Sequence, residues 1–257
     1  MLFRGKYLIG HILVIAIAIS CFFLSSWQFS RLSERKDLNR RIESRMDKAP
    51  AQLSELRNPV VGKENIKELE YRRVNISGNY DQSIEILISG RSRDGAPGYN
   101  VVTLLNLKDE QASIFVNRGW IPQSLGDEIR AGKVDEDVIA PKKINAESLV
   151  GIIRLNEREA LFADNKQVDD ERISTRIDTT LFQDITKDKY VYQFYVQLLP
   201  EQNADNNAYP IALDQPELTE RNHLSYAMQW LIFGIIAIIT WVVICVKSSK
   251  KKVGKNS

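Results

Sequence analysis

The chain is poor in cysteine and histidine, and this scarcity excludes several classes of function. Its 257 residues include only Cys21, Cys245, His11 and His223, each inside or beside an apolar segment near one end. The long middle region therefore offers no cysteine pair for a disulfide, no CxxC module, no histidine-based catalytic triad and no HExxH zinc site. GxSxG, P-loop and GxGxxG patterns are also missing from the sequence. These absences predict a protein that is not an enzyme.

Uncharged apolar segments are present instead, one at each end of the chain. Residues 7–24 and 226–246 contain no charged side chain. At about 1.5 Å of rise per residue, each segment is long enough to cross a hydrocarbon core of roughly 30 Å. The sequence thus predicts a membrane protein in which two transmembrane helices flank one β-rich α+β extracytoplasmic domain. The expected parts are a cytoplasmic N-terminus (1–6), a first transmembrane helix (7–27), the domain with an N-terminal helical stalk (28–225), a second transmembrane helix (226–246) and a basic cytoplasmic tail (247–257).

Lysine residues set the expected orientation. Five of them follow the second span, and this bias places the C-terminus in the cytoplasm. Two spans then bring the N-terminus to the same side and the central domain to the periplasm of a bacterial inner (plasma) membrane. Several arginines just past the first span oppose this orientation, but long domains cross membranes largely regardless of charge. A cleaved signal peptide remains the alternative for the first segment. The five lysines are Lys247, Lys250, Lys251, Lys252 and Lys255.

Between the spans, the hydrophobic period changes from that of a helix to that of strands. Leu38, Ile42 and Met46 recur at i+4, which predicts a helical stalk that ends before Ala49-Pro50. Acidic residues and the lack of a period indicate a mobile loop or an insertion at 125–140, and polar composition indicates a second loop at 201–207. A short helix is expected within 179–185. The expected strands are 71–77, closed by Gly78, then 84–89, 99–107, 113–117, 148–155 and 190–199.

Five motifs in this order resemble a known family. The chain reads YRRV at 71–74, Arg91, GY at 98–99, VNRGW at 116–120 and NHLSYAMQW at 222–230. Together with Trp27 and the two-helix frame, they resemble the Surfeit-locus (Surf1-like) family of cytochrome c oxidase assembly proteins over essentially the whole chain. Two departures concern Leu104, where the family usually has proline, and the tract 168–178, which aligns poorly.

The resemblance implies an assembly factor for a haem–copper cytochrome c oxidase that assists the insertion or delivery of haem a. Haem would then be a transient cofactor. The implied partners are the lipid bilayer, the catalytic subunit of the oxidase, and haem-synthesis or other assembly proteins, with no nucleic acid. A scaffold that stabilises assembly intermediates without haem is the main alternative. An extracytoplasmic ligand-binding module of a sensor or transport system is a weaker one.

His223 is the candidate haem ligand. On a helix it shares one stripe with Tyr226, Ala227 and Trp230 at the outer membrane interface, and a neutral imidazole can ligate haem iron there. Small Ala227 is expected to leave room beside the imidazole, and Trp27 joins the candidate cofactor-binding set. The alternative is a polar interfacial residue that hydrogen-bonds headgroups or the neighbourhood of Trp27. His11 lies near the opposite membrane face, so these two histidines cannot bind the same iron.

The remaining family motifs are candidates for a partner surface. They comprise Tyr71, Arg72, Arg73, Arg91, Arg118, Gly119 and Trp120. Arginine and tryptophan are common anchors at interfaces. A structural interpretation stays open for each of them: the RGW motif would end a strand above the core, and Arg72 and Arg91 would be surface charges. Alternation along a strand places Tyr71 and Arg73 on one face and Arg72 on the other.

Overall fold

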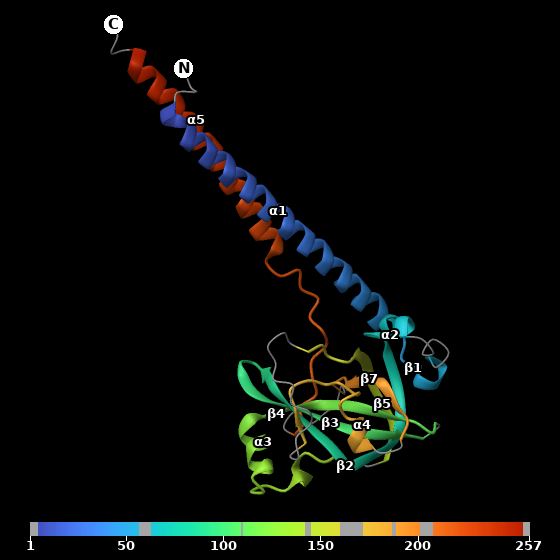
Figure 1. Ribbon diagram of the computed structural model, residues 1–257. Helices are drawn as coiled ribbons and strands as arrows, with labels where there is room; N and C mark the ends of the chain where they lie inside the picture. Colours follow the sequence, from blue (N-terminus) through green and yellow to red (C-terminus); the bar gives the residue numbers. More distant parts are fainter. Residues whose placement is uncertain are drawn as a thin grey trace. The chain divides into compact units, whose positions relative to one another are not determined.

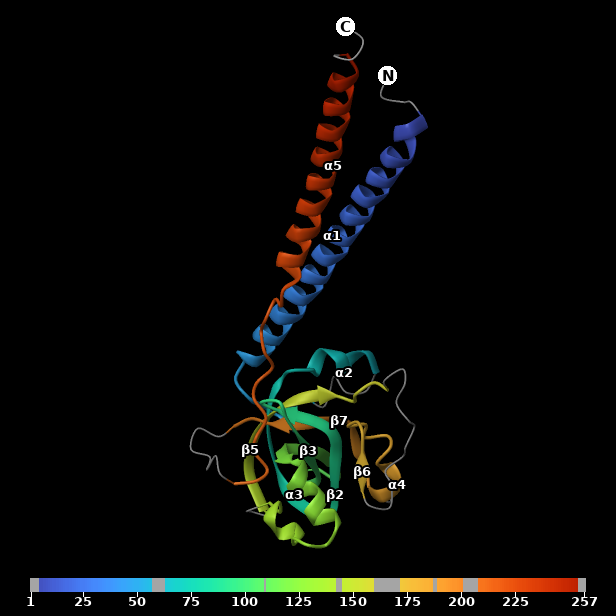
Figure 2. The same ribbon diagram turned by 90° about the vertical axis from the view of Figure 1, so that its left-hand side faces the viewer.

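The computed structural model in Figures 1 and 2 describes residues 5–56, 63–108, 110–141, 145–159, 172–186, 189–200 and 208–253. The chain forms two compact units. One consists of the residues up to Glu43 together with those from Glu217 onward, and the other of Ser44–Pro216. The first unit is helical and the second contains the sheet.

Two long helices make up the helical unit and lie side by side (Figures 1 and 2). Helix α1 spans Gly5–Met46 and α5 spans His223–Val253. Each contains an apolar window with a mean hydropathy of 2.5, of which only 11% is buried, so apolar side chains face outward. By length and composition, both are candidate membrane-spanning helices. The helix predicted to continue beyond the first apolar segment is observed, because α1 is unbroken and ends at Met46, before Ala49-Pro50.

Small residues let the two helices approach closely. Ala227 is fully buried, and its carbonyl oxygen accepts a hydrogen bond of 2.9 Å from Ser25 Oγ on α1. Gly10 faces the ring of Trp241, where an added Cβ would lie 2.0 Å from Trp241 Cη2. Small interfacial side chains and hydroxyl–carbonyl bonds are typical of helix pairs in membranes.

Cationic residues on α1 beyond the apolar segment have partners within the helical unit. Arg35 donates to the carbonyl oxygens of Thr219 (3.0 Å) and Glu217 (3.1 Å). Lys36 Nζ lies 3.5 Å from a carboxylate oxygen of Glu220. These contacts hold the segment that leads into α5 against α1. Arg35 is one of the arginines that oppose the predicted orientation, and with Lys36 it contributes to this packing.

Five strands of the second unit form a closed ring. The order β2-β3-β4-β7-β5 returns to β2, because β5 pairs with both β7 and β2. Pairing is antiparallel except between β4 and β7. Short strands β1 and β6 add to β2 in parallel. The bounds are β1 Ala51–Gln52, β2 Arg73–Arg93, β3 Ala96–Leu107, β4 Ser113–Pro122, β5 Asn145–Leu155, β6 Ile173–Ser174 and β7 Val191–Leu198.

Short helices accompany this sheet and complete the predicted mixed α+β unit. They are α2 Lys63–Leu69, α3 Gln123–Arg130, α4 Gln183–Thr186 and two 3-10 turns, η1 Leu53–Leu56 and η3 Glu136–Val138. Helix α4 overlaps the short helix expected within 179–185. One hydrophobic cluster includes Val74, Leu105, Val116, Ile153 and Phe194 from all five strands of the ring, and it forms the centre of the sheet unit.

Strand β2 corrects two expectations. Gly78 does not close a strand, because β2 continues as a single 21-residue strand and changes register between Asp81 and Glu85. Such an irregularity bends a strand without ending it, so β2 continues and pairs with both β5 and β3. Tyr71 lies before β2 in the left-handed region, with φ of 66°, and is not part of the strand.

The predicted mobile loop at 125–140 is wrong. This segment contains most of α3 and all of η3. Ile129 and Ile139 are buried in a cluster with Val101 and Ile121, so the segment packs on the sheet. In the sequence these two isoleucines are ten positions apart, with acidic residues between them, so they do not form a recognisable helix or strand pattern. The loop expected at 201–207 lies outside the described residues, as does the 168–171 part of the poorly aligned tract.

Candidate functional site

His223 opens α5 and is anchored through one ring nitrogen. Its Nδ1 lies 2.9 Å from Gln28 Oε1 on α1, and the pair is partly buried. An amide oxygen can only accept, so this contact matches the tautomer in which Nδ1 carries the proton and Nε2 has a free lone pair. Histidine ligands of metals are typically held in this way through the second nitrogen. Sequence analysis did not single out Gln28, because 195 residues separate it from His223.

The residues predicted to surround His223 differ in burial. Ala227 follows His223 by one helical turn and likewise faces α1, where it is fully buried. Tyr226 is 48% exposed and Trp27 is 52% exposed, so neither ring is packed inside the helical unit. The ring of Trp230 packs edge-on against Phe233, with 6.1 Å between centroids. A ligand of Nε2 would have to approach from a side that α1 does not occupy.

The donor set of this site fits a haem iron better than a bare metal ion. Within the described ranges, no three His, Cys, Asp or Glu side chains come together to hold a metal. Haem requires a single protein nitrogen at an axial position, since the porphyrin supplies the other ligands. His223, with an oriented ring and an available Nε2, meets this requirement.

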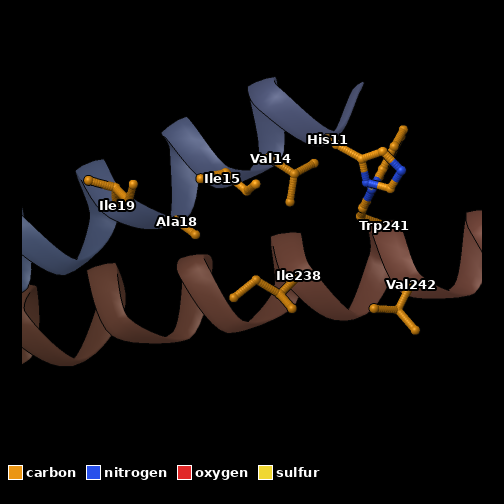
Figure 3. Close-up of a pocket in the computed structure, with 8 residues that line it drawn as sticks. All are labelled: His11, Val14, Ile15, Ala18, Ile19, Ile238, Trp241 and Val242. Atoms are coloured by element: carbon orange, nitrogen blue, oxygen red, sulfur yellow. The ribbon is translucent and has the colours of Figure 1, made fainter. Parts of the chain in front are cut away.

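His11 takes part in a different contact at the far end of the helix pair (Figure 3). Trp241 Nε1 donates to His11 Nδ1 over 2.8 Å, and the two rings meet edge to face at 5.2 Å. A cavity of about 310 Å³ adjoins them, lined otherwise by aliphatic side chains. Trp241 follows His223 by 18 positions of α5, or about 27 Å of helix. The two histidines are therefore too far apart for one iron.

In the sheet unit, the RGW motif lies within β4 and does not end it as expected. Asn117 and Gly119 pair with the consecutive residues Val102 and Val101, so Arg118 is the extra residue of a β-bulge. Gly119 has φ of 141°, and an added Cβ would lie 2.2 Å from the carbonyl oxygen of Ile211. Bulges re-aim side chains.

Arg118 enters the interior and is neutralised there. Its Nη2 lies 2.7 Å from Glu85 Oε2 and also donates to the carbonyl oxygen of Ile139, while Nε donates to Thr103 Oγ1 over 2.9 Å. Its guanidinium also faces the Tyr80 ring at 5.7 Å. Burial raises the pKa of the Glu85 carboxyl and lowers the pKa of Arg118, and each partner opposes the shift of the other.

These placements favour the structural interpretation for most of the motif residues that were predicted to contact a partner. Arg118 and Trp120 are each only 6% exposed, so they are not surface anchors. Arg72 Nη1 donates to the carbonyl oxygen of Ala49 over 2.8 Å, and Arg91 pairs with Glu157 at 2.6 Å. Arg154 stacks on the Tyr71 ring with 4.9 Å between Cζ and the ring centroid, and Arg73 is half-buried.

Comparison with known proteins agrees with this architecture. A sequence model described as the SURF1 family matches residues 15–235, which include most of α1, the whole sheet unit and the start of α5. The chain belongs to the SURF1 family. Surfeit locus protein 1 of Gallus gallus is 28% identical over 176 residues, covering 62% of this chain and 52% of that protein. The Xenopus tropicalis protein of the same name is 30% identical over 166 residues, covering 58% and 50%.

A SURF1-like protein of Monosiga brevicollis extends the similarity to nearly the whole chain. It is 24% identical over 242 residues, covering 89% of this chain and 85% of that protein. The matches to the chicken and frog relatives span about half the length of those proteins.

Proposed function

We propose that this protein assists the assembly of a haem–copper cytochrome c oxidase by holding haem transiently for the catalytic subunit. The observation that carries the proposal is the His223–Gln28 contact, which fixes the imidazole and leaves Nε2 as a ligand. Membership of the SURF1 family supports a role in oxidase assembly. The resemblance of the family motifs points to haem a as the type delivered.

Each residue of the site has a part in holding such a cargo. Bound haem would supply the iron that His223 ligates on one side. Gln28 accepts the Nδ1 proton, which orients the imidazole and raises the basicity of Nε2. Because His11 accepts a hydrogen bond from Trp241 at the far end of the helix pair, His223 would be the histidine that holds the iron. One protein ligand suits a carrier that must release its cargo, whereas two histidines hold haem more firmly.

Deletion of the gene is expected to lower the activity of cytochrome oxidase while its subunits are still made. The physical reason is that the catalytic subunit would lack a haem donor rather than a folding partner. Haem extraction and absorbance spectra of membranes, together with immunoblots of the subunits, measure the two quantities separately. Normal activity and haem content, in a strain with no related copy, would contradict the proposal. Loss of the subunits themselves would favour a scaffold without haem.

The same proposal places both termini in the cytoplasm and the sheet unit on the outer side of the membrane. A bacterial inner membrane remains a prediction from sequence. Alkaline phosphatase is active only outside the cytoplasm, so a fusion at Gly132, an exposed turn residue, is expected to be active. A fusion after Val253 is expected to be inactive. The reverse pattern of activities would invert the orientation and move the haem site to the cytoplasmic face.

A further inference from the structure

Arg73 lies on β2 and Arg154 on β5, which pairs with β2 in the sheet unit. Arg73 pairs with Ile152 in the antiparallel register of β2 and β5, and Arg154 follows Ile152 by two positions on the same face. Diagonal neighbours of this kind have Cα atoms about 7–8 Å apart, well within the reach of two arginine side chains. Two positive charges are therefore close together on one face.

Neither guanidinium group meets a carboxylate among the described residues. The Nε atoms of Arg73 and Arg154 are buried without a hydrogen bond, and neither side chain has an ion pair in the described ranges. Both residues are half-buried. Arg91 and Arg118 show what arginines in this unit usually have, since each meets a carboxylate within 2.7 Å. Half-buried cations are normally paired, because removal of water from an unpaired charge is unfavourable.

Tyr71 positions one of the two arginines. It has the uncommon φ of 66°, and its backbone N–H donates to the carbonyl oxygen of Ile153 over 2.8 Å. Its ring faces Arg154 with 4.9 Å between Cζ and the ring centroid. Stacking on an aromatic face restricts a guanidinium and leaves its edge for hydrogen bonding. Because the Nε atom of each arginine is buried, a ligand would bind the terminal nitrogens, Nη1 and Nη2.

We propose that Arg73 and Arg154 form a binding site for a carboxylate group, with Tyr71 as a positioning residue. The planar fork of guanidinium matches a carboxylate in bidentate geometry. The carboxylate of Glu157 is paired with Arg91 at 2.6 Å. Burial raises the pKa of neighbouring Tyr195 to about 12, so its phenol adds no negative charge.

This site is independent of the proposed haem function and is tested without haem. The full chain, labelled with ¹⁵N-arginine in nanodiscs of zwitterionic lipid, is titrated with succinate, and the Nε–H signals of Arg73 and Arg154 are followed. We expect a saturable shift of both signals. Arg73→Gln and Arg154→Gln should each raise the dissociation constant by about tenfold or more, since each removes charge-assisted hydrogen bonds. Arg158→Gln, a change at an exposed arginine, should leave the dissociation constant unchanged.

Lysine variants keep the test valid if the glutamine variants fail to fold. Arg73→Lys and Arg154→Lys retain the charge but lose the fork, so they should fold and still bind succinate more weakly. An equal shift with sodium chloride at the same ionic strength would show mere screening and overturn the proposal. Tighter binding of inorganic phosphate would overturn the carboxylate assignment. Binding only after the acidic residues of 160–171 are neutralised would show that the chain itself fills the site.

Discussion

His223→Ala is expected to abolish haem binding by the purified chain, whereas His11→Ala is expected to leave it unchanged. The Nε2 of His223 is the available imidazole nitrogen at its end of the helix pair, while Nδ1 of His11 is engaged by Trp241. A position about 27 Å away along α5 cannot supply the other axial ligand. Titration with haem, followed by the Soret absorbance of detergent-solubilised protein, measures the binding of each variant.

Gln28→Ala provides the graded companion to these two substitutions. It keeps the imidazole but releases Nδ1, and loss of such a supporting contact typically weakens metal affinity by about 10–100-fold. Circular dichroism should confirm that all three variants retain their helices. An equal loss of haem binding from the His11 and His223 variants would show that this location of the site is wrong. Haem binding that survives His223→Ala would do the same.

Arg118→Ala is expected to lower the free energy of unfolding of the sheet unit by about 3–5 kcal/mol. The substitution leaves the carboxylate of Glu85 buried without its cation, although Thr103 Oγ1 still donates to it, and removes the donor to the Ile139 carbonyl. An uncompensated buried charge is among the most destabilising single defects in proteins. Denaturant unfolding of the full chain in detergent, followed by tryptophan fluorescence, measures this loss.

The pH dependence of the Arg118→Ala variant distinguishes a lost charge pair from a lost side chain. Burial already raises the pKa of Glu85, so protonation favours the folded state, and stability falls as pH rises through that raised pKa. Without Arg118 the pKa should rise further, and the deficit should shrink in acid. Arg72→Ala, which removes one exposed bond to Ala49, is the matched control and should cost about 1 kcal/mol. A deficit in Arg118→Ala that does not change with pH would contradict this account.

Local composition was sufficient for much of the fold. Two uncharged apolar segments predicted the two long helices. Exposure of so many apolar side chains to water is unfavourable, and segments of this length are typical of membrane-spanning helices. The strands at 99–107, 148–155 and 190–199 were predicted because β-branched and alternating residues there match the period of a strand. The order of the family motifs correctly indicated the SURF1 family.

Contacts between distant parts of the chain decided the rest. Sequence alone identified His223 as a ligand candidate, but the Gln28 oxygen that fixes its ring lies 195 residues away, and Ser25 packs against Ala227 from 202 residues away. Similarly, Arg118 reads as a surface anchor until the bulge in β4 turns it toward Glu85. Gly78 reads as a strand end until β3 and β5 pair with it on either side. Propensity and periodicity describe what a segment can form by itself, whereas burial, charge pairing and the available face of a side chain depend on which other segment packs there.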